Sequence, residues 1–320
     1  MTLTHPVASN PFANASELRN LELMQKFTTD SFRSVCADTS VYHAWQVLVP
    51  QKALSHNFLM YGLLAFTSLH IASTSQQPVA LSYVDTAIQY YNMTFSPFRD
   101  ALDNLTSSNC DAVFANSILV AATGLALPRL DMGSGGFKSN MIETISVASD
   151  LIQGVTRIHE IGRAWFSSPI LTEYYARDEN LQHGILDSGA RAALSRLSML
   201  NHETVMDQTQ RAINQKALSV LEYCFSRLVD SNYHKEDTMS WLILVDKEFS
   251  DCLKRREPFS LLILMHWAVL LDRLDGHVWW VRSAGKDLVS ELTEELRTSN
   301  PLWEAAKTWP QQIVSPVANK

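Results

Sequence analysis

Four side chains in this sequence have the chemistry to move a proton or polarise a bound molecule: His266, His70, Tyr61 and Asp272. His266 stands alone in the apolar run LLILMHWAVLL, and Asp272 follows that run directly. A lone histidine there is either a hydrogen-bonded core residue or a group that faces a pocket, and both interpretations stay open. Asp272 is either part of an acid–base set or an ion pair or cap at a helix end. As general acids or bases, the four groups would support proton transfer without a nucleophile or a metal ion.

Motifs for other kinds of chemistry are missing from the sequence. The 10 histidines include no HxH, HxxxH or HExxH pattern, and the 4 cysteines form no CxxC pair. Neither set therefore has the spacing of zinc ligands. The sequence also lacks GxSxG and the aspartate-rich DDxxD pattern, and the glycines at 133–136 do not have the spacing of a phosphate-binding loop. We expect no cofactor and no metal ion.

The composition indicates helices around a large core. Hydrophobic residues make up 46% of the 320 residues and charged residues 18%, with only 11 glycines and 11 prolines. Apolar residues recur every three or four positions along most of the chain, which is typical of helices that bury one face. The sequence predicts an all-α protein, a single large helical domain of about a dozen helices over residues 16–314. A flexible lead-in at 1–15 and a tail at 315–320 flank it.

Three stretches are apolar on nearly every side: 58–73, 112–127 and 259–271. Such helices are buried from most directions, and a hydrophobic cavity is expected where they converge. Aromatic and methionine side chains at helical spacing also suit a plain core, so both readings stay open. The predicted pocket residues are Phe58, Tyr61, Leu64, Phe66, His70, Phe114, Ile118, Met265, His266 and Val269.

Prolines mark the expected helix boundaries, because proline lacks the N–H that a helix interior uses. We expect Pro50 to end or break a helix, Pro97 to separate two helices, and Pro128 to stop the helix before it. Residues 238–256 and 278–297 each have the periodicity of one helix.

Charge and hydropathy restrict the partners and the location. The net charge is -7, and the one basic triplet, at 254–256, is followed by Glu257, as at the end of a helix. Binding to nucleic acid depends on phosphate neutralisation, so we expect no direct nucleic-acid binding by this chain. No apolar run reaches the roughly 18 residues of a membrane span, and the N-terminus has no signal-peptide core. The four thiols are expected to be buried and reduced in an intracellular protein, cytoplasmic or nuclear.

Several segments, taken in their order along the chain, resemble a known family. They are LELMQKFTT at 21–29, WQVLVP at 45–50, the stretch 53–72, the stretch 83–122, LLILMHWAVLLDRL at 261–274, and 302–310. Together they resemble the regulatory region of fungal zinc-cluster transcription factors of the sterol uptake control protein type. The resemblance implies a helical ligand-binding domain that holds a sterol-type molecule in a deep apolar pocket, and it implies a homodimer.

The six-cysteine zinc cluster of that family has no counterpart in this sequence. The chain begins with an ordinary Met-Thr-Leu-Thr-His, and we expect a natural short form rather than an excised domain. The first functional hypothesis is a regulatory protein that binds a hydrophobic, sterol- or terpenoid-like molecule. The second is a fungal secondary-metabolite enzyme, a cofactor-independent cyclase, pericyclase or isomerase that works by positioning a polycyclic substrate. The third is a structural protein that acts as a decoy by dimerising with full-length relatives. Its interface would be the helix at 205–230, although that helix also suits internal packing.

Overall fold

The structure is a computed structural model, and it describes residues 15–36, 41–130, 140–150, 185–228 and 235–314. Every regular element in these ranges is helical, which confirms the all-α class. The tail, the glycines at 133–136 and residues 1–14 of the predicted lead-in lie outside them, and α1 begins at Ala15. The elements are α1 (Ala15–Thr29), η1 (Ser31–Ser34), η3 (Ala44–Leu48), α2 (Val49–Ala53), α3 (Asn57–Thr74), α4 (Val79–Asp103), α5 (Cys110–Leu130), α8 (Ser188–Thr204), α9 (Gln208–Arg227), α10 (Lys235–Leu244), α11 (Lys247–Lys254), α12 (Pro258–Asp272), η5 (Trp279–Val281), α13 (Ala284–Glu295) and α14 (Pro301–Val314).

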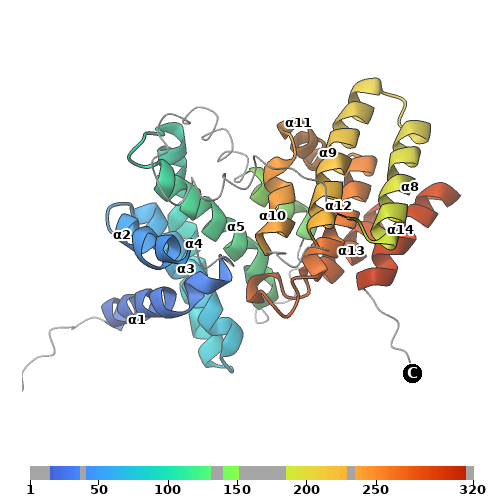
Figure 1. Ribbon diagram of the computed structural model, residues 1–320. Helices are drawn as coiled ribbons and strands as arrows, with labels where there is room; N and C mark the ends of the chain where they lie inside the picture. Colours follow the sequence, from blue (N-terminus) through green and yellow to red (C-terminus); the bar gives the residue numbers. More distant parts are fainter. Residues whose placement is uncertain (1–14, 37–40, 131–139, 151–184, 229–234, 315–320) are drawn as a thin grey trace, which may run out of the picture.

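The helices form two groups (Figure 1). In the N-terminal half, α1 to α5, the buried helix α3 packs against α1, α4 and α5. In the C-terminal half, α8 to α14, the apolar helix α12 is surrounded by α9, α13 and α14. The three apolar stretches of the sequence are thus confirmed as core helices, two in one half and one in the other.

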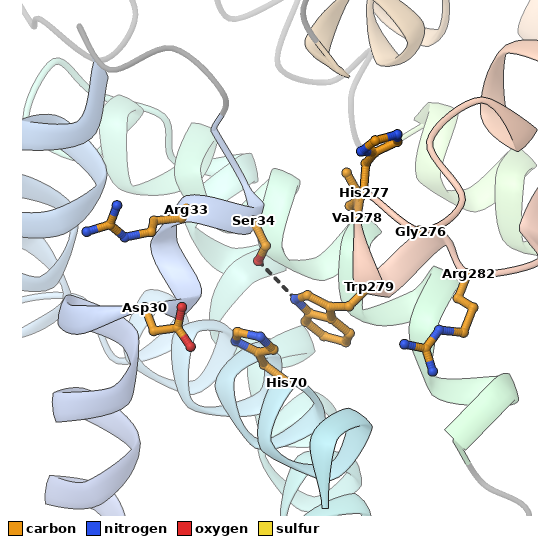
Figure 2. Close-up of a pocket in the computed structure, with 9 residues that line it drawn as sticks. All are labelled: Asp30, Arg33, Ser34, His70, Gly276, His277, Val278, Trp279 and Arg282. Carbon is orange, nitrogen blue, oxygen red and sulfur yellow. Dashed lines mark hydrogen bonds between the residues drawn. The ribbon is translucent and has the colours of Figure 1, made fainter.

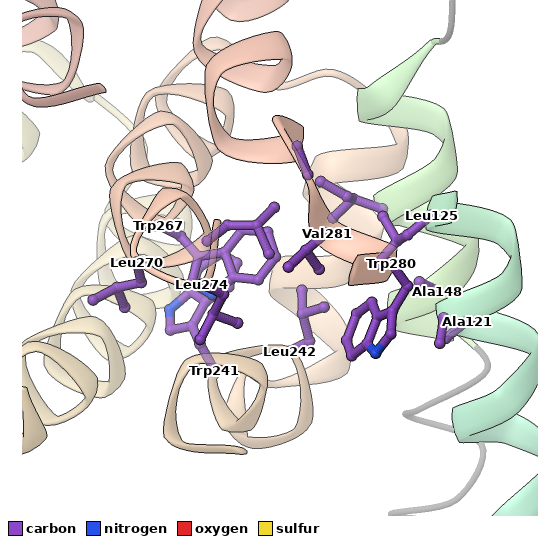
Figure 3. Packing of buried hydrophobic residues seen from close by; sticks show 14 of the residues in the cluster. Ala121, Leu125, Ala148, Trp241, Leu242, Trp267, Leu270, Leu274, Trp280 and Val281 are labelled. Atoms are coloured by element: carbon purple, nitrogen blue, oxygen red, sulfur yellow. The ribbon is translucent and has the colours of Figure 1, made fainter. Parts of the chain in front are cut away.

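The two halves are in contact at residues 273–283, the turn between α12 and α13, which we call the seam turn, and through the ion pair between Arg129 of α5 and Asp287 of α13. Its short helix η5 packs against α3 and α5 of the N-terminal half. Trp280 and Val281 are buried there, and Trp280 lies between Ala121 of α5 and Leu242 of α10 (Figure 3). The hydrophobic core is therefore continuous from one half to the other.

Three of the expected proline boundaries are wrong. Pro97 lies inside α4 and Pro128 inside α5, while Pro50 stands in the first turn of α2 and continues the preceding π-helical turn η3. A proline in a first helical turn loses no hydrogen bond. Inside α4 the lost bond is offset by packing, because the next residue, Phe98, is buried against the ring of Phe58 at 5.8 Å.

Two stretches expected as single helices are each divided. Residues 238–256 contribute to α10 and α11, which separate at Val245 and Asp246, where Asp246 has extended backbone angles. Residues 278–297 contain η5 and then α13, because Ser283 adopts a left-handed conformation with φ of 60°. Helical periodicity persists across both breaks, so the pattern alone did not reveal them.

Two features of the sequence can be compared with the burial of individual residues. All four cysteines are free and buried, as expected. One described helix, Cys110–Leu130, has the length and hydropathy of a membrane span, but 83% of its most apolar window is buried inside the protein. That burial is what a core helix shows.

Candidate ligand-binding site

A pocket of about 280 Å³ opens where the seam turn meets the N-terminal half (Figure 2). We call it the seam pocket. Its lining residues come from both halves: Asp30, Arg33, Ser34, His70, Gly276, His277, Val278, Trp279 and Arg282.

The N-terminal wall is built by two helix ends. His70 lies near the end of α3, and Asp30 directly follows α1. The chain then enters the 3-10 turn η1, which buries Ser31 and Phe32 and turns Ser34 toward the pocket. The short turn is what allows side chains so close in sequence to face the same pocket as His70.

The side chains of the pocket form a closed set of contacts. His70 Nδ1 lies 2.8 Å from the Ser31 hydroxyl, and the Ser34 hydroxyl donates to the Ser31 carbonyl at 2.7 Å. Trp279 Nε1 donates to the Ser34 hydroxyl at 3.0 Å. The Trp279 ring completes the circle by stacking on His70, with centroids 5.0 Å apart and planes 6° from parallel.

A second tryptophan strengthens the junction. Trp280 Nε1 donates to the backbone carbonyl of Ser34 at 2.9 Å. Both indole N–H groups of the seam turn are therefore bound by one residue of the N-terminal half. Buried indole groups usually need such a partner, so Ser34 holds the two halves in register.

Burial keeps the imidazole of His70 neutral. Desolvation lowers the pKa of His70 to about 4, although the negative charge of Asp30 acts in the opposite direction. The pKa of Asp30 is lowered chiefly by its hydrogen bond from Lys26, 2.5 Å away. At neutral pH the pocket thus contains an uncharged histidine and a carboxylate that already has a cationic partner.

The two arginines of the pocket differ in their surroundings. The guanidinium of Arg33 lies over the rings of Phe32 and Tyr42, at 5.2 and 5.5 Å, and it points away from Trp279 (Figure 2). Arg282 is exposed, and its guanidinium has no hydrogen bond or ion pair with any residue in the described ranges.

The geometry suits binding better than covalent catalysis. Ser31 beside His70 has the residue types of a nucleophile and its base. However, Ser31 is 0% exposed, so a substrate carbonyl cannot reach its hydroxyl. An imidazole with a pKa of about 4 is also a weak base at neutral pH. Among the described residues no group of three or more metal-ligating side chains occurs.

The ten predicted pocket residues divide between the two halves. In the N-terminal half, Phe58, Leu64, Phe66 and Phe114 are buried, whereas Tyr61, His70 and Ile118 are half-buried. The other three, Met265, His266 and Val269, are buried in α12 of the C-terminal half. Of the ten, His70 lines the seam pocket, and Phe66 supports it by contacting Trp279 at 5.1 Å. That all ten line one apolar cavity stays a prediction.

The four candidate catalytic residues have separate surroundings. Tyr61 stacks on Tyr90 of α4 at 6.1 Å. His266 is buried against Trp309, with its Nε2 lacking a hydrogen-bond partner. Asp272 Oδ1 also lacks a partner, and burial raises the pKa of that carboxyl. Only His70 reaches the seam pocket.

Sequence reasoning missed Ser31, Ser34, Trp279 and Arg282 as site residues. Serines and an exposed arginine carry no signal of their own in a single sequence. The adjacent tryptophans after Gly276 were the one available signal, because two large aromatic residues in a turn need partners from elsewhere in the fold.

Comparison with known proteins provides the context for this site. No protein-family model matches the chain. A Zn(2)-C6 fungal-type transcription factor of Gibberella zeae is 24% identical over 323 residues, which cover 96% of this chain and 64% of that protein. This chain is related to fungal Zn(2)-C6 transcription factors. Sterol uptake control protein 2 of Candida albicans is 25% identical over 126 residues, 39% of this chain and 17% of that protein. The chain spans less than two thirds of either relative, and the resemblance seen in the sequence is confirmed.

Proposed function

We propose that the chain is a regulatory protein that binds a hydrophobic, sterol- or terpenoid-like small molecule in the seam pocket. One observation carries the proposal: the pocket is lined from both halves of the protein, with the Trp279–His70 stack as its wall. A ligand bound there contacts α1, η1 and α3 on one side and the seam turn on the other.

Such a position gives a ligand control over how the halves are arranged. A ligand shifts a conformational equilibrium by its difference in affinity for the two arrangements. A pocket inside one half would bind equally well whether or not the halves were displaced. The seam pocket would lose one wall, so binding and the arrangement of the halves are linked.

The relatives favour a hydrophobic ligand in a regulatory protein. The name of the Candida relative refers to sterol uptake control, and the Gibberella relative is a transcription factor. A volume of about 280 Å³ lies just below the range of about 300 to 1,000 Å³ that is usual for small-molecule sites. It would therefore hold a compact ligand, or one end of a longer one, against the indole of Trp279. We place the protein in the cytoplasm or nucleus, and homodimer formation stays a prediction.

The enzyme hypothesis has less support. A cyclase or isomerase that transfers a proton would need at least one acid or base at the reacting atoms, and three of the four candidates lie away from the pocket. The remaining one, His70, is a weak base because of its low pKa.

Binding by the purified chain tests the proposal. We would identify co-purifying molecules by native mass spectrometry, and then titrate the protein with dehydroergosterol while following energy transfer from tryptophan. A ligand at about 100 times its Kd should raise the free energy of unfolding by about 2.7 kcal/mol. Trp279→Leu should weaken binding, whereas Trp303→Leu, a change on α14 in the C-terminal half, should not. If no apolar ligand co-purifies, and neither a sterol nor a terpenoid probe stabilises the protein, the proposal is wrong.

A further inference from the structure

The seam pocket has one cation without a partner among the described residues. Asp30 is the sole carboxylate among the lining residues, and it is held by Lys26 at 2.5 Å. The acids near the seam turn also have cationic neighbours. Asp275 pairs with Lys286 at 3.6 Å, and Asp272, the last residue of α12, lies near the positive charges of Lys286 and Arg273. Of the two lining arginines, Arg33 lies over the rings of Phe32 and Tyr42, and Arg282 remains as the positive charge that is open to a ligand.

The backbone holds this arginine at the rim. Ser283, the next residue, has φ of 60°, and Gly276 at the start of the turn has φ of 81°. A left-handed conformation is uncommon for a residue with a side chain and persists when the surroundings impose it. Between these two positions, both tryptophans are bound to Ser34. The backbone position of Arg282 is thereby set before any ligand arrives.

The wall beside Arg282 is flat and uncharged. Trp279 and His70 are stacked nearly parallel, and the histidine is neutral at pH 7 because its pKa is about 4. Val278 adds a buried aliphatic side chain. A flat apolar body would lie against this wall without having to neutralise a charge.

We propose that the ligand of the seam pocket is an organic acid, in which a carboxylate on a flat apolar body is bound by Arg282. A guanidinium matches a carboxylate with two parallel hydrogen bonds. This inference rests on the proposed function, since it names the chemical class of the molecule bound at the same site. A neutral sterol alcohol would give Arg282 no anionic partner.

Two probes with the same ring system separate the acid from its neutral counterpart. We would titrate the full chain with 2-naphthoate and with 2-naphthalenemethanol, following the quenching of tryptophan fluorescence and the shift in Tm. The naphthoate should bind at least about tenfold more tightly, the ratio expected for hydrogen bonds to a charged group. Arg282→Gln should remove that preference without weakening the binding of the alcohol.

A matched control excludes a general effect of charge. Arg273→Gln removes a second exposed arginine of the same turn that does not line the pocket, and it should leave the preference unchanged. Circular dichroism and urea unfolding would show that both variants fold.

The possible failures are distinguishable. Equal binding of both probes to the wild-type protein, or a preference that survives Arg282→Gln, would overturn the acid while leaving the pocket as a ligand site. An equal loss in Arg273→Gln would overturn it too, because the preference would then come from net charge. If neither probe binds, the acid is wrong, and the dehydroergosterol titration then decides whether the pocket is a ligand site.

Discussion

Acidification tests the burial of His266, a histidine placed deep in the C-terminal half. The residue is 1% exposed. Its Nδ1 lies 2.9 Å from the Leu262 carbonyl oxygen, and its Nε2 has no hydrogen-bond partner. Desolvation lowers the pKa of His266 from 6.5 to about 4; the hydrogen bond to Leu262 opposes this shift, and the charge of Arg196 adds to it.

The sign of the effect follows from proton uptake. An unfolded chain protonates this imidazole near pH 6.5, whereas the folded protein does so only near pH 4. Between these values the unfolded state binds more protons, so the free energy of unfolding falls as the pH falls. From pH 7 to pH 5 we expect His266 alone to remove about 2 kcal/mol of stability.

Other groups titrate over the same range, so a variant is needed to isolate His266. His70 acts in the same direction, since its pKa is also lowered to about 4. The carboxyls of Asp272 and Glu291 act in the opposite direction, because burial raises their pKa. His266→Phe keeps an aromatic ring beside Trp309, 5.7 Å from the imidazole, and cannot take up a proton. His202→Gln, at an exposed position of α8, is the control.

Urea unfolding at pH 7 and pH 5 supplies the four free energies of each comparison. The wild-type protein should lose about 2 kcal/mol more than His266→Phe between the two pH values, and His202→Gln should follow the wild type. If His266→Phe and the wild type lose the same stability, the imidazole is solvated or partnered in the folded state, and the reasoning from burial is refuted.

Three further changes test the packing and the seam. Gly285→Ala should lower the free energy of unfolding, measured in urea, by about 2 kcal/mol. The added methyl group would lie 2.5 Å from the Asp272 backbone nitrogen, and relieving that overlap costs up to about 3 kcal/mol. The higher helix propensity of alanine offsets about 1 kcal/mol of this cost. No loss would show that α13 moves freely away from α12. Ser34→Ala removes the hydroxyl that accepts the Trp279 Nε1 hydrogen bond, so the free energy of unfolding in urea should fall by about 1 kcal/mol. Unchanged stability would mean that water replaces the hydroxyl. Lys307→Met should lower the free energy of unfolding by about 2 kcal/mol, because Lys307 is 2% exposed and its Nζ donates at 2.9 Å to the carbonyl of Leu296, the residue that follows α13. A thermal melt equal to that of the wild type would contradict this.

The helices were predictable because their signal is local. Residues 58–73 and 112–127 are continuous apolar runs, and the structure has α3 as Asn57–Thr74 and α5 as Cys110–Leu130. The failures at Pro97 and at Ser283 have a common cause. Whether a helix tolerates a proline or ends at a serine depends on what packs against it, such as Phe58 against Phe98, and a single sequence does not show that contact.

The site was less predictable than the fold for the same reason. His70 was a candidate because a histidine on an apolar helix is conspicuous, but its partners Ser31 and Trp279 come from the end of α1 and from the turn after α12. Their roles depend on a long-range contact, the meeting of the two halves, that no periodicity encodes. By contrast, His266 has an equally conspicuous sequence position, and the structure buries it away from the seam pocket.

Ser34 joins the stability of the seam to the affinity of its pocket. Its hydroxyl and its carbonyl bind the two indole N–H groups, and its hydroxyl also donates to the residue that bonds His70. A ligand resting on the Trp279–His70 wall therefore depends on contacts that Ser34 maintains. Because the Ser34 hydroxyl fixes Trp279, a ligand that rests on this wall should bind Ser34→Ala more weakly than the wild-type protein. Equal affinity in the two proteins, with the variant clearly less stable, would mean that the ligand does not contact the seam.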